Sequence, residues 1–240
     1  MLEEEFQKIV DSRRSNRAFD PHIEVADLII ERGIKRAILA PNSSNMQLWE
    51  FQWIQSEEML QKMTPLCLGQ SAAKTAKHMV VFITRKDKWR SRAKWNYNKI
   101  AESVDGKPGK LQKGALNYYK KLIPIVYFND PFGITSVLRK SVSFLLGIRK
   151  PFYRLGGKAE QRIAVHKSCA LAAQTFMLSI AAEGFHSCPM EGFDKKRVRK
   201  ILKLPRGAEI NMIVSVGKGT EKGIWGPRHR VPYEDVVTKK

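Results

Sequence analysis

Five consecutive apolar residues, Met-Val-Val-Phe-Ile at positions 79–83, constrain the fold of this chain more than any other segment. A strand with one solvated face alternates apolar and polar residues, whereas an uninterrupted apolar run is typical of a strand buried on both faces. We therefore expect residues 79–83 to form a central strand of a sheet.

Helical and strand-like patterns alternate along the rest of the chain. Helices are predicted over residues 3–12, 21–40, 57–63, 70–77, 135–146, 161–183 and 194–202, and strands over residues 51–55 and 210–216. Residues 123–128 are a further strand candidate, which Pro124 restricts to a sheet edge or to the lead-in of a loop. The alternation favours a layered α/β or α+β domain, and the lack of a G-x-G-x-x-G motif disfavours a dinucleotide-binding Rossmann domain.

The charge balance of the chain is unusual. Its 240 residues include 43 Lys and Arg against 23 Asp and Glu, a formal net charge of +20. Such a charge attracts polyanions, among them phosphate-bearing cofactors, nucleic acid and anionic lipid, although it also fits a solvated basic surface. Three cysteines without a C-x-x-C pair, and a start that does not resemble a signal peptide, lead us to expect a cytoplasmic protein.

The first predicted helix is followed by Arg-Arg-Ser-Asn-Arg at residues 13–17. Guanidinium groups offer planar forks of donors to phosphate oxygens, and the hydroxyl of Ser15 adds another donor. A second basic pair, Arg228 and Arg230, lies late in the chain. Each segment taken alone also fits a solvated basic surface, so both interpretations stay open at this point.

Two predicted loops are rich in groups that bind ligands. Residues 41–47, Pro-Asn-Ser-Ser-Asn-Met-Gln, carry more polar side chains than a simple connection between a helix and a strand requires. Residues 187–193, Ser-Cys-Pro-Met-Glu-Gly-Phe, join the longest helix to the next one, and Pro189 and Gly192 fix a loop whose N–H groups can point at a ligand. Glu191 has no visible carboxylate partner, so its backbone N–H is a better functional candidate than its side chain.

The order and spacing of these segments resemble the nitroreductase family of FMN-dependent oxidoreductases. Three family motifs match this chain: R-[RH]-S-x-[RK] matches residues 13–17, P-S-x-x-N-x-Q-P-W matches residues 41–49, and G-[LF]-x-x-x-P-[IM]-x-G-[FY] matches residues 184–193. The basic pair that the family has late in the chain is matched by Arg228 and Arg230. The resemblance covers about residues 6–84 and 160–236. Asn42 stands where the family usually has serine, and Leu48 where it usually has proline.

The resemblance implies one domain over residues 1–240, with the three-layer α-β-α fold, a mostly antiparallel central sheet and an intertwined homodimer. It also implies FMN at the dimer interface, NADH or NADPH as electron donor, and an electron-poor acceptor such as a nitroaromatic or a quinone. The implied cofactor-binding residues are Arg13, Arg14, Ser15 and Arg17 with Arg228 and Arg230 at the phosphate side, Pro41, Asn42, Ser43 and Asn45 from the partner subunit, Gln70, and Pro189, Met190, Glu191 and Gly192 against the flavin ring. No catalytic acid or base and no metal site is expected.

Residues 85–160 match nothing in the family residue by residue and are expected to form a variable segment that covers the substrate side of the flavin. Trp95, Tyr97 and Lys99 suit the lid of a flavin-dependent dehalogenase or dehydrogenase, or a basic helix with inward-packed aromatics. The basic and aromatic residues 85–99 could also bind single-stranded nucleic acid by charge and base stacking. Residues 132–152 could lie on an anionic membrane surface. Neither segment contains a recognisable nucleic-acid-binding motif.

Overall fold

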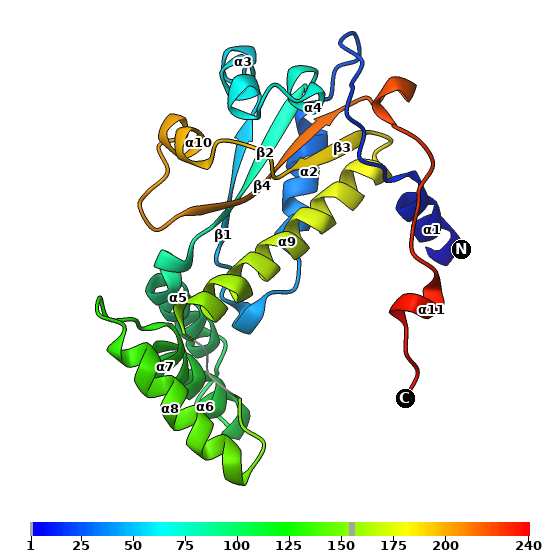
Figure 1. The fold of residues 1–240 in the computed structure, drawn as a ribbon. Helices are drawn as coiled ribbons and strands as arrows, with labels where there is room; N and C mark the ends of the chain where they lie inside the picture. The colour runs from blue at the N-terminus through cyan, green and yellow to red at the C-terminus, as the bar shows by residue number, and fades with distance from the viewer. Residues whose placement is uncertain (1, 154–156) are drawn as a thin grey trace.

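A layer of strands lies between helices, and a separate helical lobe extends from one end of this body (Figure 1). The computed structural model describes residues 2–153 and 157–240. Its elements in chain order are α1 (Leu2–Ser12), α2 (Asp27–Ala37), η1 (Ser43–Asn45), β1 (Trp49–Ile54), α3 (Glu57–Leu66), α4 (Ser71–Lys74), β2 (His78–Thr84), η2 (Lys86–Lys88), α5 (Trp89–Glu102), α6 (Lys110–Asn117), η3 (Tyr118–Leu122), α7 (Ile123–Tyr127), α8 (Ile134–Arg149), α9 (Lys158–Ala182), β3 (His186–Met190), α10 (Lys195–Ile201), β4 (Glu209–Gly217), η4 (Glu221–Gly223) and α11 (Tyr233–Val236).

The described strands form one sheet in the order β1-β2-β4-β3, and every pair in it is antiparallel. All residues of β2 are buried, which confirms the prediction of a central strand over residues 79–83. The prediction of a loop over residues 187–193 is wrong in its first part, because His186–Met190 is the edge strand β3. Pro189 is tolerated there because an edge strand does not need every N–H for the ladder.

Each face of the sheet has its own hydrophobic core. Met79, Val81 and Ile83 point into a core closed by α3, α4 and α10. Val80 and Phe82 point into the other core, which α2 and α9 close. The continuous apolar run of β2 is thus explained by period-two alternation between two covered faces, and the predicted three-layer fold is confirmed.

Helix α2 packs tightly on α9. A Cβ atom added to Gly33 would lie 2.8 Å from Phe176 Cε2, so the two helices approach closely only because Gly33 has no side chain. Within the described residues, α9 is the helix long and apolar enough to cross a membrane, and half of that stretch is buried inside the protein. Its apolar side chains belong to the core on the sheet.

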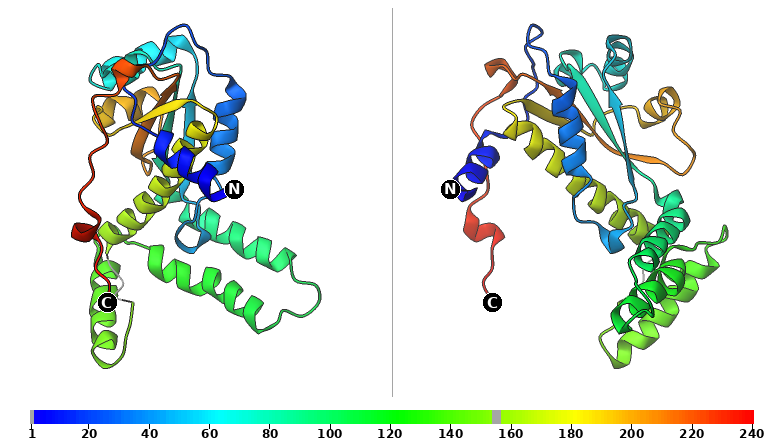
Figure 2. Two further views of the ribbon diagram at one scale, coloured as in Figure 1. Left: turned by 90° about the vertical axis from the view of Figure 1, so that its right-hand side faces the viewer. Right: turned by 180° about the vertical axis from the view of Figure 1, so that it is seen from behind.

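The helical lobe consists of α5 to α8 and lies beyond the sheet in all three views (Figures 1 and 2). The predicted strand over residues 123–128 is wrong, because Ile123–Tyr127 is the helix α7. Pro124 lies in the first turn of α7, where the N–H that proline lacks is not needed. A third core, which includes Leu48, Ile123, Tyr127 and Val165, joins the lobe to the body.

Candidate functional site

The arginine-rich residues 13–17 run along the outer edge of β3. Ser15 forms a parallel bridge with Ser187, and the N–H of Asn16 donates to the Ser187 carbonyl at 3.2 Å. The buried Asn16 side chain donates to the Thr220 carbonyl at 2.8 Å and accepts from the N–H of Ala18 at 3.1 Å. Sequence reasoning left Asn16 as a spacer in the motif, whereas the structure shows that it fixes the path of the motif.

Arg13 is surrounded by other arginines. Burial lowers the pKa of Arg13, and the nearby positive charges of Arg228, Arg230 and Arg14 lower it further. Its guanidinium makes no hydrogen bond or ion pair with any residue that the structure describes. The carboxylate of Asp11 lies near Arg228 instead, with 3.9 Å between Asp11 Oδ1 and Arg228 Nη1, at the limit of an ion pair. A half-buried cation without its own counter-charge is suited to bind an anion.

The late basic pair is tied to the same place by main-chain contacts. Arg228 Nη2 donates to the carbonyl of Asp11 in the last turn of α1, at 2.9 Å, and to that of Arg13 just after this helix, at 2.8 Å. Arg14 donates to the Gly226 carbonyl at 2.7 Å, and the guanidinium of Arg17 lies 4.2 Å from the centre of the Trp225 ring. The structure therefore brings together the two basic segments that the sequence separates by about two hundred residues.

The turn after β3 lies beside the predicted polar residue Gln70. Gln70 Nε2 donates to the Gly192 carbonyl at 2.6 Å and to the Cys67 carbonyl at 3.0 Å. Met190 is buried in the core, whereas Glu191 is exposed and its backbone N–H has no partner in the described part of the chain. A free N–H next to a set of cations adds a second kind of donor to this end of the sheet.

Cys188 connects the turn to the arginines. Burial raises the pKa of the Cys188 thiol, and the positive charges of Arg17 and Arg13 oppose that rise. The thiol therefore stays protonated, and it lies buried on β3 near Arg17 and Arg13. Residues 13–17, 70, 189–192 and 228–230 form one group, which we call the basic group.

The loop over residues 41–47 has a strained and well-fastened backbone. Ser44, Asn45 and Gln47 all have positive φ angles, of 56°, 47° and 47°, which are uncommon for residues other than glycine. Asn42 Oδ1 accepts from the Gln47 N–H at 2.8 Å. Asn45 Nδ2 donates to Asn96 Oδ1 at 3.1 Å, and Asn96 Nδ2 donates to the Asn45 carbonyl at 2.9 Å.

Two predicted members of this loop keep their side chains available. Pro41 and Ser43 are exposed, and Ser43 makes a contact through its N–H, which donates to Ser168 Oγ at 3.1 Å. Asn96, on α5, is a residue that sequence reasoning missed, since nothing in the family motifs points to residues 85–160. Asn96 is buried although most of its basic helix is exposed, and this burial, visible only in the structure, is what indicates its role.

The loop and the basic group do not meet within one chain. The loop contacts Ser168 in the middle of α9, whereas the basic group lies past the end of this helix at Ala182. These two positions are about 21 Å apart along the helix axis at 1.5 Å per residue. In Figure 1 the loop lies at the lower end of α2 and the basic group lies near α1. The residues predicted to bind one cofactor thus fall into two separate groups.

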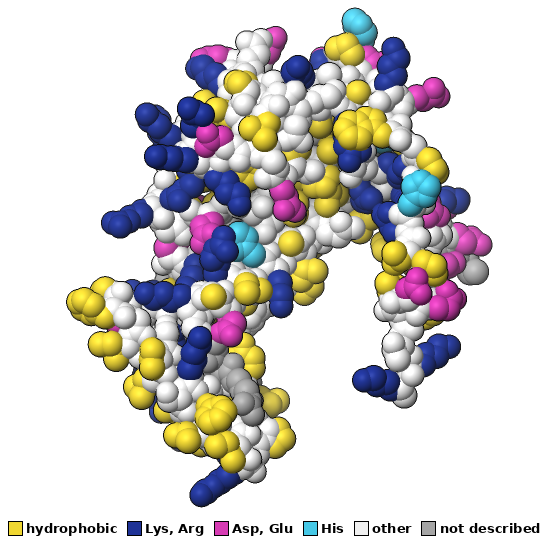
Figure 3. Space-filling view, in the orientation of Figure 1, with side chains coloured by type: hydrophobic (Ala, Val, Ile, Leu, Met, Phe, Trp, Pro, Cys, Tyr) yellow, Lys and Arg dark blue, Asp and Glu magenta, His cyan; other side chains and the backbone are white. Residues whose placement is uncertain are grey.

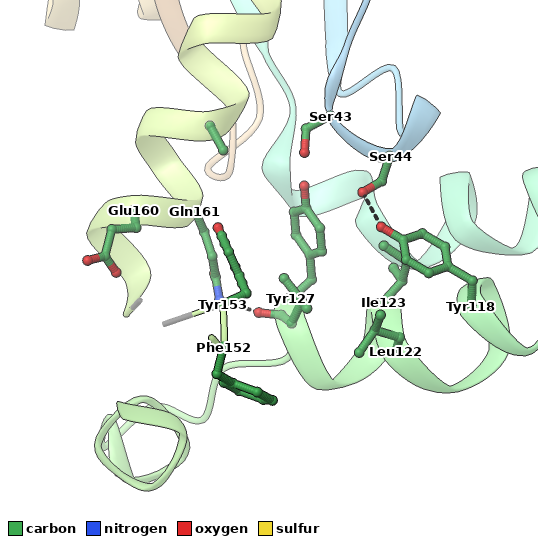
Figure 4. Close-up of a pocket in the computed structure, with 12 residues that line it drawn as sticks. Ser43, Ser44, Tyr118, Leu122, Ile123, Tyr127, Phe152, Tyr153, Glu160 and Gln161 are labelled. Atoms are coloured by element: carbon green, nitrogen blue, oxygen red, sulfur yellow. Dashed lines mark hydrogen bonds between the residues drawn. The ribbon is translucent and has the colours of Figure 1, made fainter. Parts of the chain in front are cut away.

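A cavity of about 530 Å³ opens beside the loop (Figure 4). Its residues come from the loop, from residues 118–127, from the segment after α8 and from the start of α9. They are Ser43, Ser44, Tyr118, Leu122, Ile123, Val126, Tyr127, Phe152, Tyr153, Glu160, Gln161 and Ala164. Tyr118 and Ser44 share a hydrogen bond of 2.6 Å between their hydroxyls, and Tyr119 donates to the Ser44 carbonyl at 2.9 Å. Burial raises the pKa of Tyr127 to about 12, so this lining residue is a neutral donor.

The three residues predicted for an alternative substrate lid do not line this cavity. Trp95 is about half exposed, and Lys99 pairs with Glu102 at 2.6 Å. Tyr97 lies with Trp89 in a different depression of the lobe. The cavity therefore gives no support to the dehalogenase interpretation.

Comparison with known proteins identifies the class of this protein. The sequence model of the nitroreductase family matches residues 10–218, and the chain belongs to this family. A Staphylococcus haemolyticus protein assigned as an NAD(P)H nitroreductase is 26% identical over 234 residues, covering 94% of this chain and 92% of the relative. The predictions of the family and of an oxidoreductase are thereby confirmed.

Solved structures agree on the fold. The Bacillus subtilis protein ydfN, assigned as a nitroreductase, superposes with a TM-score of 0.76 at 20% identity over 99% of this chain and 100% of its own. An Exiguobacterium sibiricum protein of the same assignment, in complex with FMN, has a TM-score of 0.66 at 22% identity over 98% of this chain and 97% of its own. The FMN in that structure and the NAD(P)H in the relative's name are the cofactors that the sequence predicts.

Proposed function

We propose that this protein is an FMN-dependent oxidoreductase that takes two electrons from NADH or NADPH and delivers them to an electron-poor organic acceptor such as a nitroaromatic or a quinone. The observation that carries the proposal is the guanidinium of Arg13, which lies among three other arginines without a counter-charge of its own. The basic group fits the phosphate of FMN by charge and by donor chemistry. Family membership supplies the redox class.

Each part of the basic group has its own task in this proposal. Arg13, Arg14, Ser15 and Arg17 bind the phosphate and the polar edge of the cofactor, with Arg230 adding positive charge. Arg228 already donates to main-chain carbonyls, so it holds the segment in place. Bound FMN supplies the hydride chemistry, and the basic residues favour its anionic reduced form.

The residues on the ring side act through donors and shape. The free N–H of Glu191 offers a hydrogen bond to the flavin ring, and Pro189, Met190 and Gly192 fix the turn that presents it. Gln70 braces this turn through the Gly192 carbonyl. No proton transfer from a side chain is needed, because the chemistry depends on positioning and electrostatics.

We further propose a homodimer in which Pro41, Asn42, Ser43 and Asn45 of one chain complete the site of the other. Two observations support it. The loop and the basic group are too far apart to bind one flavin within a single chain, and large apolar surfaces are left open. Helix α1 buries no residue, and it lies with the segment after η4 at the margin of the body (Figure 2). The exposed apolar residues of these parts are Leu2, Phe6, Trp225, Val231, Tyr233, Val236 and Val237.

Residues 1–240 form a single functional domain in this proposal, with residues 85–160 covering the acceptor side. The cavity beside Ser43 and Ser44 is the acceptor site. The three cysteines are free thiols, which suits the reducing cytoplasm that we propose as the compartment.

Flavin release tests the proposed function. The purified protein is expected to be yellow and to release about one FMN per chain on heat denaturation, measured by fluorescence and chromatography. NADH or NADPH is expected to bleach the bound flavin without added acceptor. A colourless protein that takes up no added FMN would contradict the proposal.

A further inference from the structure

Helix α8 is packed with its polar side inward. The residues that face the rest of the lobe are polar or small: Thr135, Ser136, Arg139, Ser143 and Gly147. Arg139 is buried and donates to the carbonyls of Ile125 and Phe128 and, at 2.8 Å, to Asn129 Oδ1. The polar face is therefore the one that the fold uses to hold this helix.

The outward face of α8 is apolar. At 100° per residue, its exposed apolar side chains cover an arc of about 200° around the helix. They are Ile134, Val137, Leu138, Val142, Phe144, Leu145, Leu146 and Ile148, each between 41% and 66% exposed, and Phe132 precedes the helix at 88%. Figure 3 shows hydrophobic side chains gathered on this lobe. A helix of a soluble lobe ordinarily presents the opposite arrangement.

The lobe that carries α8 is strongly basic. Residues 85–153 contain sixteen Lys or Arg and four Asp or Glu, a net charge of +12 within the +20 of the whole chain. Residues 131–153 contain no acidic residue, whereas Lys140 is exposed beside the apolar face, and Arg149 and Lys150 are exposed at its C-terminal end. An apolar helical face flanked by cations is complementary to an anionic lipid surface, where acyl chains receive the apolar side chains and headgroups receive the cations.

We propose that α8 docks this protein on the surface of an anionic lipid bilayer. A second copy of this chain is a poorer partner for the same face, because it would bring another lobe of net charge +12 against the first. At 16 residues and about 1.5 Å per residue, α8 is about 24 Å long, which is short for a span and suits a helix lying in the interface. Single-stranded nucleic acid would use the charge but would leave the apolar face unpartnered.

The docking helix leads directly to the cavity. Phe152, three residues beyond the end of α8, lines the cavity beside Ser43 and Ser44. The acceptor class that follows is a lipid-soluble, electron-poor compound such as a quinone with an apolar tail. This step rests on the proposed function, whereas docking itself does not.

Vesicle co-sedimentation tests the docking. The full-length protein is mixed with vesicles of phosphatidylcholine alone or with one quarter phosphatidylglycerol, and the bound fraction is measured at low and high salt. We expect binding to the anionic vesicles, weakening as salt rises, and little binding to the neutral ones. Equal binding to both vesicles, or binding to single-stranded RNA without binding to vesicles, overturns the proposal.

A matched pair of variants separates the face of α8 from the lobe as a whole. Leu145→Glu and Leu111→Glu make the same change at exposed leucines of one lobe, on α8 and on α6. We expect Leu145→Glu to lower the vesicle partition coefficient at least tenfold and Leu111→Glu to lower it less than threefold, with circular dichroism unchanged. Equal effects of the two variants on vesicle binding overturn the proposal. So does dissociation of the dimer by Leu145→Glu in the absence of vesicles, measured as a drop in molecular mass, because it would show that the apolar face binds a second copy of the chain.

The acceptor step has its own readout. Oxidation of NADH or NADPH by the flavin-loaded protein is compared with a short-chain soluble quinone and with a long-chain quinone embedded in the anionic vesicles. We expect Leu145→Glu to slow turnover of the embedded quinone only. Vesicle binding without turnover of the embedded quinone overturns the lipid-soluble acceptor and leaves docking intact, whereas failure to bind FMN at all is a failure of the proposed function.

Discussion

The guanidinium group has two contrasting surroundings in this chain. Arg85 is buried but fully paired: it forms ion pairs with Glu50 and Asp87, at 2.8 Å for the second. Arg13 is half-buried among other arginines and is paired with nothing in the described structure. The charge of Arg85 is thus balanced by carboxylates within the fold, whereas the charge of Arg13 is left to be balanced by a ligand.

The Arg13 contribution can be measured by substitution. Arg13→Gln is expected to weaken FMN binding roughly ten- to hundredfold, because hydrogen bonds to charged groups contribute about 1.5–3 kcal/mol. Arg206→Gln, at an exposed site before β4, makes the same change of charge and serves as the control. Titration of the apoprotein followed by flavin fluorescence gives both dissociation constants. Similar constants for the two variants would remove Arg13 from the site.

The Arg85 network predicts a dependence of stability on pH. Hydrogen bonds from Arg85 lower the pKa of Asp87 below its ordinary value of 3.8. A lowered carboxyl pKa stabilises the folded state above about pH 4, and this stabilisation is lost as pH falls through the folded value. The destabilisation caused by Asp87→Asn is therefore expected to be larger at pH 7 than at pH 3, as measured by urea unfolding. Asp105→Asn, at an exposed loop position, is the control, and an Asp87→Asn effect independent of pH would contradict the prediction.

At the scale of elements, the helices and strands with a clear apolar periodicity were predicted correctly. Those whose secondary structure depends on contacts with residues far along the chain were missed. The central strand and the long helix α9 follow from the sequence because apolar side chains repeat at the period of each element. Residues 123–128 carry strand-like apolar residues, yet they continue a helical run from α6 through η3, and Ile123 and Tyr127 are buried by residues far along the chain. The edge strand β3 was missed because its pairing with β4 is not encoded locally.

For the candidate site, the motifs named the residues of both the loop and the basic group, since short polar segments are visible in the sequence, and their role in binding FMN stays a prediction. Asn16 and Asn96, which fasten those segments, carry no signal of their own, because their role depends on backbone groups brought close by folding.

The contact of α2 with α9 gives a prediction for this scale. Gly33→Ala is expected to destabilise the protein by about 1–3 kcal/mol, since the added Cβ would meet the Phe176 ring at 2.8 Å. Gly114→Ala, in the exposed helix α6 with no atom within 4 Å of the added Cβ, is expected to stabilise it by about 0.5–1 kcal/mol. Thermal or urea unfolding compares them, and the same sign for both variants would refute this account of the packing.

At the scale of the whole molecule, the distance between the loop and the basic group is the decisive feature. If the loop and the basic group bind one flavin, as we propose, two chains must combine their halves. Dimerisation would then be part of the proposed site, and exposed apolar side chains on α1 and on the C-terminal segment are available to bury in it.

Complementation between two inactive variants tests this directly. Arg13→Gln damages the basic group, and Ser43→Trp fills the exposed loop position. A heterodimer of the two variants has one site with both defects and one site with neither, so coexpressed chains carrying different tags are expected to bind about half of the normal FMN. Each homodimer is expected to bind little. A heterodimer as empty as the homodimers would mean that each chain builds its site alone.

The contact between Arg228 and the Arg13 carbonyl joins residues 215 positions apart in the sequence. During synthesis the arginine-rich motif is therefore made early but acquires this contact only after residue 228 has left the ribosome. A chain that stops before residue 228 lacks the segment that orders the basic residues. If these residues bind FMN as proposed, such a chain is expected to bind it poorly.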